Sequence, residues 1–571
     1  MTSVSTPTVR PSTSRRPKGL LTAASIAVAL AAADTYVVVL AITDMMSGVG
    51  LSIDELQKAT PIISGFLLGY VAVLPLIGRL SDLISRQRIL LLCLGIFVIG
   101  SCITALATDL PTLIGGRVVQ GIGGGGLVPG TLALVADLWP RGKRGTPLGI
   151  VGAVQELGSV LGPLLGALIL VIADWRMIFW VNAILGVVLA LSIRAIGGPQ
   201  PLADSTRRVP RWWGWLTGLV SLVAGVLFWL ALAAPDVLAQ SVQWWGAAFV
   251  PYGDHTARLF TPIGVWATIA IVLAIVLSAR YWWPILRQVD LIGALLMAVF
   301  LGCIVLTFST TNPEKQVVGP MGLWLLPVAV VAAVLFVLRQ RTAAVPLITK
   351  GTVVGRVIPA LIASLLVGAS LVAVIVDVPL LARLTSDGGE TEAAFVLVRF
   401  LFAVPVGALI GGYLLRRFGP AQIASVGLVV AGLGLISMST WGFGSLESWV
   451  SWPVLILVGL GFGAAIAPVN DAALADATEE AHGVVSSLVV VCRMIGMVLG
   501  LALLTAIGLH RFYAEIESMA KPSVRQLAEA GVVQCQTVFL GAGVLALIAA
   551  GVCWFLGREK IAVPEDATPF L

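Results

Sequence analysis

Long apolar runs alternate with short polar segments along almost the whole chain. Each run approaches the roughly 20 residues that an α-helix needs to cross the hydrocarbon core of a bilayer. The pattern therefore predicts an all-α polytopic membrane protein with sixteen spans. The predicted spans are residues 20–42, 60–77, 89–107, 110–136, 147–172, 177–196, 213–234, 262–281, 291–308, 321–338, 357–384, 393–415, 421–440, 450–469, 484–509 and 537–556.

An even number of spans puts both ends of the chain on one side of the membrane. Most of the 35 Lys and Arg residues fall in the N-terminal tail and in the loops on that same side. Cytoplasmic loops carry such an excess, so we expect both termini in the cytoplasm. A cleaved signal peptide is the weaker alternative for the basic N-terminus, because the first apolar run continues to Ile42.

The chain also repeats itself at a nearly constant offset. Residues 158–162 (GSVLG) match residues 496–500 (GMVLG), and residues 129–137 match residues 468–476. Duplicated bundles that rock about a shared central site are typical of secondary transporters. We therefore expect two six-helix pseudo-repeat bundles with four inserted transmembrane helices between them.

This repeat predicts the organisation of the whole chain. A basic cytoplasmic tail precedes the first bundle, a linker contains the four additional helices, and the second bundle includes an outer helical extension at 510–536. The predicted parts are residues 1–19 (tail), 20–196 (first bundle), 197–356 (linker), 357–557 (second bundle) and 558–571 (cytoplasmic tail).

Composition narrows the possible classes of protein. Hydrophobic residues make up 58% of the chain and charged residues 11%, against about 25% charge in ordinary soluble domains. This excludes a soluble enzyme, a secreted disulfide scaffold and a nucleic-acid binder. The six cysteines lie in or beside apolar runs without a metal-binding spacing, so we expect small buried side chains and no metal site.

Four motifs resemble those of the major facilitator superfamily, in particular its drug:proton antiporter branch with fourteen helices. One lies in the loop after the second run, where Ser85 replaces the usual glycine. Another is Arg117-Val-Val-Gln120-Gly121 in the fourth run, and the third is the antiporter motif of the fifth run. The fourth, at the start of the sixth run, consists of Trp175-Arg176 and Phe179-Trp180-Val181-Asn182. The loop motif contains Gly78, Asp82, Arg86 and Arg88, and the antiporter motif contains Gly158, Gly162, Pro163 and Gly166.

The amino-acid sequence of three further segments is similar to that of an actinobacterial subgroup of this branch, which exports triacylglycerides or drugs. These segments are Asp34-Thr35-Tyr36, Gln155-Glu156-Leu157 and Cys492-Arg493-Met494. The resemblance implies a lipophilic small molecule or lipid as substrate and an extracytoplasmic lipoprotein as a possible partner. It also implies the proton gradient as energy source, with no cofactor. The extra hairpin at 213–281 is not a feature of the subgroup.

Charges inside membrane spans are costly and therefore mark functional candidates. Asp34 and Arg117 are predicted to lie at the same depth, and we take Asp34 as the candidate proton site and Arg117 as the cation that approaches it. A static ion pair between the first and fourth spans is the alternative interpretation.

Two further pairs match in depth. Glu156 is predicted to point away from the stripe of Gly158, Gly162 and Gly166 on its helix, and so toward a possible cavity. Across that cavity, Arg493 would act as a gate or as a second proton relay. A purely structural ion pair is an equally open interpretation. For Asp377 and Arg399, on consecutive spans, we expect a structural ion pair.

The motif residues suggest mechanical roles. The glycine stripe lets another helix approach closely, and Pro163 permits bending. The loop with Asp82, Arg86 and Arg88 is expected to latch the two bundles in one state, with contact to lipid headgroups as the alternative.

Together these features predict a proton-coupled secondary exporter of a lipophilic substrate, working by alternating access in the cell membrane. A transporter of a small polar solute and a non-transporting membrane scaffold are the alternatives. An enzyme is not expected, because the three histidines are scattered and none heads a catalytic motif. No phosphate-binding loop of an ATP-driven pump is found in the sequence.

Overall fold

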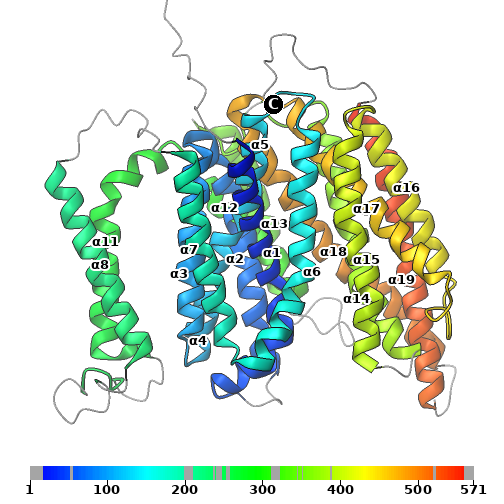
Figure 1. Cartoon of the computed structure of the whole chain (residues 1–571), viewed down its shortest axis with the longest axis horizontal. Helices are drawn as coiled ribbons and strands as arrows, with labels where there is room; N and C mark the ends of the chain where they lie inside the picture. Colours follow the sequence, from blue (N-terminus) through cyan, green and yellow to red (C-terminus); the bar gives the residue numbers. More distant parts are fainter. Residues whose placement is uncertain are drawn as a thin grey trace, which may run out of the picture.

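The computed structural model describes residues 17–51, 56–198, 210–235, 238, 247–252, 258–309, 322–343, 345–349, 351–385, 389–517 and 523–557. In these residues the secondary structure is helical, without strands (Figure 1). Among the residues described, fifteen helical segments are long and apolar enough to cross a membrane, with Leu110–Leu138 counted as one. The one remaining predicted span, residues 291–308, corresponds to α12, whose apolar part Leu291–Thr307 is shorter. The all-α polytopic fold is thus confirmed.

Two bundles of helices stand side by side in the centre and right of Figure 1. The first bundle contains α1 (Pro17–Gly48), α2 (Leu56–Leu83), α3 (Arg86–Ala105), α4 (Leu110–Gly125), α5 (Leu127–Leu138), α6 (Gly145–Ile172) and α7 (Arg176–Gly197). The second contains α14 (Val357–Thr385), α15 (Gly389–Leu414), α16 (Pro420–Met438), α17 (Ser451–Ala475), α18 (His482–Glu517) and α19 (Val524–Cys553).

Helix pairing repeats between the two bundles, as the sequence repeat implies. In the first bundle α1 packs on α6, α2 on α4, and α3 on α7. In the second, the equivalent pairs are α14 with α18, α15 with α17, and α16 with α19. The single predicted span at 110–136 is split at Gly126 into α4 and α5, which together still form one crossing.

The matched glycine motifs make the same contact in each bundle. A Cβ atom added at Gly158 or Gly162 of α6 would collide with the backbone of α1. A Cβ atom added at Gly496 or Gly500 of α18 would collide with the backbone of α14 in the same way. Close approach of two helix backbones is what small residues permit in membranes, so the repeat encodes one packing interface twice.

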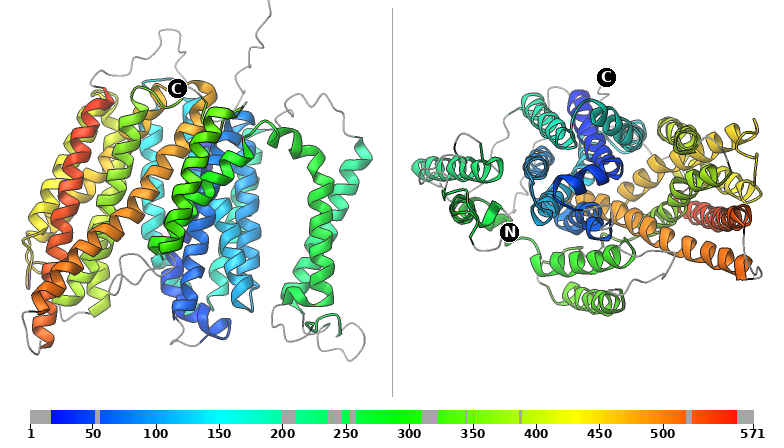
Figure 2. Two further views of the ribbon diagram at one scale, coloured as in Figure 1. Left: turned by 180° about the vertical axis from the view of Figure 1, so that it is seen from behind. Right: turned by 90° about the horizontal axis from the view of Figure 1, so that it is seen from below.

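The four additional helices form two hairpins outside both bundles. In the pair α12 (Leu291–Ser309) and α13 (Gly322–Thr342), α12 packs on α2 and α18, so the pair covers one side of the junction between the bundles. The helices α8 (Arg211–Ala233) and α11 (Pro262–Leu286) pack against each other and against the short helix η2 (Arg258–Phe260). This second hairpin stands apart at the edge of the molecule (Figure 2).

Both described chain ends lie at one face of the molecule, called here the terminal face (Figure 1). The bundles meet along two seams, α2 with α18 and α6 with α15. Toward the terminal face the second seam is tight, because Gly149 of α6 faces the backbone of Ala408 and Gly412 on α15. At the opposite face α18 continues to Glu517 and α19 begins at Val524, as helical extensions.

Gly162→Val should loosen the packing of α6 on α1, because the added side chain meets the backbone of Ala33. Overpacking of this kind costs about 1–3 kcal/mol, so the unfolding temperature of the purified protein should fall. The matched control is Gly95→Val on α3, where a Cβ atom meets nothing within 4 Å. Equal losses in both variants would mean that helix propensity, rather than the close approach, explains the effect.

Candidate functional site

Asp34 lies at the centre of a buried polar network in the first bundle. Its carboxylate pairs with the guanidinium of Arg117 from α4 and accepts hydrogen bonds from the side-chain amides of Gln120 and Asn182. Asp34 is 1% exposed, and Arg117 and Gln120 are fully buried. Three helices, α1, α4 and α7, therefore supply a carboxylate and all of its donors.

Arg117 has other partners besides Asp34. Its guanidinium donates to Oε1 of Gln120 at 2.7 Å and to the carbonyl of Ile62 at 3.4 Å. It also lies over the ring of Phe66, 4.4 Å from the centroid, and 5.7 Å from that of Phe179. A buried cation that loses its only counter-ion is strongly destabilised, but this one retains acceptors and aromatic faces if Asp34 becomes neutral.

The sequence predicted the meeting of Asp34 and Arg117, but not the complete network. Gln120 and Asn182 stood in recognised motifs without an assigned role. Gln120 is three residues after Arg117, so both side chains share a face of one helix, and this spacing is a signal that could have identified it. The packing of α7 against α1 that brings Asn182 to Asp34 is a tertiary contact without a local signal.

Glu156 and Arg493 pair across the junction between the two bundles. The carboxylate comes from α6 and the guanidinium from α18. Their side chains are 12% and 15% exposed. As predicted, Glu156 faces away from the glycine stripe, which packs on α1. This pair links the bundles near the middle of α6.

A cavity of about 40 Å³ lies beside Arg493, where the two bundles face each other. Its polar lining consists of Gln155, Ser364, Asn470 and Arg493, and the rest is mainly aliphatic. Pockets for drug-sized molecules are roughly 300–1,000 Å³. In this conformation the central space therefore holds little more than water.

The predicted latch residue Asp82 binds the other bundle at the terminal face. Its carboxylate oxygens accept hydrogen bonds from the backbone N–H groups of Gly483 (2.7 Å) and Val484 (3.1 Å). These N–H groups belong to the first turn of α18, where free donors and the helix dipole favour an anion. Gly78 allows this approach, since a Cβ atom there would lie 2.8 Å from Cβ of Ser487.

Arg86 and His482 extend this contact. Arg86 donates to Asp82 at 3.1 Å and to Asp137 at 3.0 Å. Nδ1 of His482, the first residue of α18, lies 3.6 Å from a carboxylate oxygen of Asp137. We call the set Asp82, Arg86, Asp137, His482, Gly483 and Val484 the latch.

Ser85 lies in the turn between Asp82 and Arg86, at the position where the loop motif usually has a glycine. Its φ of −59° is accessible to any residue, so the departure from the usual loop motif costs no backbone strain. Arg88, also named in that motif, follows in the first turn of α3.

Other contacts between the bundles lie at the same face. Arg141 donates to the carbonyl of Ala477 at 3.3 Å, and Arg144 donates to that of Leu474 at 3.4 Å. Arg416 donates to the hydroxyl of Thr146 at 3.2 Å. Together with the latch and the tight half of the α6–α15 seam, they close the molecule at the terminal face.

The expected ion pair between Asp377 and Arg399 is wrong, because these two described residues do not contact each other as an ion pair. Arg399 instead lies over the ring of Trp452 on α17, 3.8 Å from the centroid. Asp377 is buried within α14. Equal depth in the membrane does not fix the direction of a side chain around its helix, which explains the error.

No group of three His, Cys, Asp or Glu side chains that could hold a metal ion occurs in the part of the chain that the structure describes. The site has three groups of charged side chains. One carboxylate is enclosed in the first bundle, one ion pair crosses the junction, and one latch closes the terminal face.

Comparison with known proteins agrees with this architecture. A family model described as Major Facilitator Superfamily matches residues 24–249 and 252–501. A triacylglyceride transporter of Mycobacteroides abscessus is 36% identical over 538 residues, which cover 92% of this chain and 88% of that protein. A triacylglyceride transporter of Mycobacterium tuberculosis is 34% identical over 557 residues, covering 94% and 92%.

Solved structures with the same fold are more distant in sequence. The proton:xylose symporter XylE has a TM-score of 0.57 at 13% identity, with 96% of this chain and 97% of that chain covered. The human organic anion transporter MFSD10 has a TM-score of 0.56 at 13% identity, with 94% and 99% covered. At this identity the likeness shows the fold alone.

Asp82→Asn should weaken the latch, because an amide carries no charge and has only one acceptor oxygen for the two N–H groups of α18. Hydrogen bonds to charged groups contribute about 1.5–3 kcal/mol, enough to shift the balance between conformations substantially. Spin labels at the terminal-face ends of α7 and α16 should then report longer distances. The control is Asp174→Asn, whose exposed side chain lies 3.6 Å from Arg176. Unchanged distances in Asp82→Asn would refute a latching role.

Glu156→Gln and Arg493→Gln should each destabilise the protein, because each leaves one poorly hydrated charge without its partner. The double variant should lose less stability than the sum of the two single variants, by about 0.5–3 kcal/mol. Denaturation of all four forms measures this coupling. Strict additivity would show that the two charges do not stabilise each other.

Proposed function

The chain belongs to the major facilitator superfamily, and we propose that within it the protein is a proton-coupled exporter of lipophilic molecules such as triacylglycerides. It is a multi-pass membrane transporter, not an enzyme. The observation that carries the proposal is the buried carboxylate of Asp34, whose cationic partner can remain satisfied without it. Relatives named triacylglyceride transporters support a lipid substrate.

Asp34 is the proposed proton site. In the conformation described here it is ionised, because Arg117, Gln120 and Asn182 all donate to it. When a rearrangement of α1 or α4 separates it from Arg117, the isolated carboxylate takes up a proton, since a lone charge is costly there. Arg117 then rests on Gln120, the carbonyl of Ile62 and the aromatic rings. A static pair would not require these second partners.

Alternating access follows from the contacts between the bundles. The latch and the adjoining contacts hold the terminal face closed, which we assign to the cytoplasm from the excess of Lys and Arg. Separation of the latch, together with rupture of the pair between Glu156 and Arg493, would open the cavity toward that side. We accordingly propose the plasma membrane as location, with both termini in the cytoplasm.

The lining of the central cavity favours an uncharged, lipophilic cargo. Its polar groups are few, and most lining side chains are aliphatic. Export of drugs through the same space is the second part of the proposal, because an apolar lining makes few demands on the shape of the cargo. A small polar solute would require more hydrogen-bonding groups than this lining provides.

At the opposite face, the extended ends of α18 and α19 offer a place for an acceptor of the exported lipid. These two helices have 36 and 30 residues, more than a membrane crossing requires. An extracytoplasmic lipoprotein, the partner that the family resemblance implies, would receive the lipid there.

The proposal is tested in proteoliposomes with an imposed pH gradient. A labelled triacylglyceride should move in wild type in proportion to the gradient, and a cationic dye serves as a second cargo. Asp34→Asn should abolish the dependence on the gradient, because an amide neither binds nor releases a proton. Asp290→Asn is the matched control, since Asp290 is also buried and paired, at 3.0 Å from Arg339 on α13, outside both bundles.

Gradient-driven lipid movement that persists in Asp34→Asn would refute Asp34 as the proton site. Movement of the dye alone would leave a multidrug antiporter and overturn the lipid substrate. If neither cargo responds to the gradient in wild type, proton-driven export of lipophiles is wrong.

A further inference from the structure

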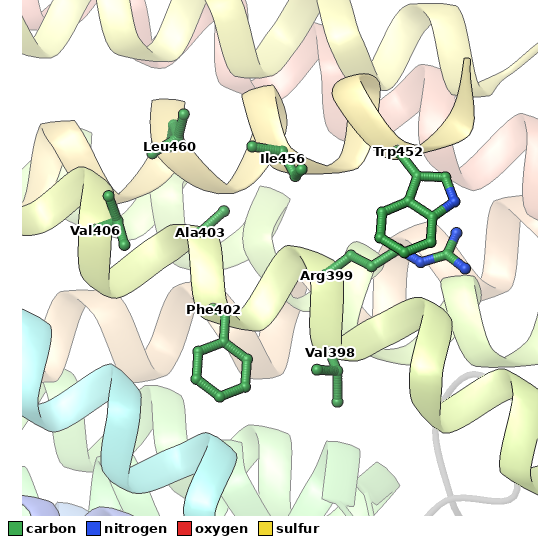
Figure 3. Close-up of a pocket in the computed structure, with 8 residues that line it drawn as sticks. All are labelled: Val398, Arg399, Phe402, Ala403, Val406, Trp452, Ile456 and Leu460. Atoms are coloured by element: carbon green, nitrogen blue, oxygen red, sulfur yellow. The ribbon is translucent and has the colours of Figure 1, made fainter. Parts of the chain in front are cut away.

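A groove of about 690 Å³ runs along the second bundle between α15 and α17, in the half of the membrane away from the terminal face. Its wall is formed by Phe402, Ala403 and Val406 of α15 and by Ile456 and Leu460 of α17. Figure 3 shows these side chains along the two helices, with Arg399 and Trp452 together at one end. Its volume lies within the roughly 300–1,000 Å³ of small-molecule sites.

The groove lies beside the seam between α6 and α15. That seam is tight toward the terminal face, where Gly149 meets Ala408. Beyond this point, apolar side chains of both helices are exposed, among them Leu164 and Leu168 on α6 and Phe402 on α15. Phe402 points toward α6 in Figure 3. The groove is therefore continuous with the lipid-facing half of the junction through which cargo would leave.

Arg399 gives the groove one polar end. Its guanidinium lies 3.8 Å from the centroid of Trp452, in the first turn of α17. Stacking on a ring uses the face of a guanidinium, whereas its N–H groups donate in the plane of the group. An extended apolar channel that ends at a donor is complementary to a fatty acyl chain that ends in an ester.

We propose that this groove binds one acyl chain of the exported acylglycerol, with the ester carbonyl oxygen accepting a hydrogen bond from Arg399. The inference rests on the proposed function, since it names the place where that substrate leaves the protein. An ester carbonyl needs a single donor, which Arg399 supplies. A phospholipid phosphate has several oxygens to satisfy, and the remaining lining side chains offer only the indole N–H of Trp452.

Photolabelling of the full-length protein in proteoliposomes tests the proposal. One probe is a triacylglyceride with a diazirine on one acyl chain, and the other is a phosphatidylcholine with the same labelled chain. The triacylglyceride should label peptides of α15 and α17, and excess unlabelled triacylglyceride should remove this label. Ala403→Trp fills the groove and should abolish it, and Arg399→Gln should reduce it.

The matched control is Ala195→Trp, at an exposed position on α7. It should keep the label, and if Ala403→Trp does not fold, Ala403→Leu takes its place. Triacylglyceride labelling that is unchanged in Ala403→Trp would overturn the proposal. So would equal labelling by phosphatidylcholine that triacylglyceride does not displace, because the groove would then hold bulk lipid.

The two proposals fail separately. Gradient-driven transport without labelling of α15 and α17 would refute the groove alone. Labelling without gradient-driven transport would refute proton-coupled export and leave acylglycerol binding in the groove.

Discussion

An ion enclosed in hydrocarbon must keep a counter-charge or donors around it, and this constraint governs the first bundle. Asp34 and Arg117 satisfy each other, and Gln120 and Asn182 complete the shell. The helices that carry these groups, α1, α4 and α7, cannot separate freely without exposing a charge. A change in the protonation of one carboxylate therefore acts on the packing of three helices at once, which is what a transporter driven by protons requires.

The contacts between the bundles are of a different kind. Gly149 and the latch bring backbone and polar groups of the two halves together, and Glu156 with Arg493 adds one charge pair across the centre. Each of these contacts can be exchanged for water when the terminal face opens. Strong cohesion within bundles and exchangeable contacts between them are the mechanical basis of alternating access.

Much of this architecture was readable from the sequence. Hydropathy located the spans, and the glycine motifs at 158–162 and 496–500 revealed the repeat, because both are local patterns. The Asp377–Arg399 pair was wrong because depth along a helix carries no information about rotation around it. The latch partners, the N–H groups of Gly483 and Val484, have no side-chain signature at all. The peripheral position of the α8–α11 hairpin likewise depends on tertiary packing.

The central claim is that export of lipid displaces a proton from Asp34. The most direct measurement is proton release from purified protein in weak buffer when a triacylglyceride is added, followed with a pH-sensitive dye. The account predicts release in wild type and in Glu156→Gln, from the molecules in which Asp34 has separated from Arg117 and taken up a proton, and none in Asp34→Asn. Release of the same size in Asp34→Asn would contradict it, and Asp34 would then be a structural member of an ion pair.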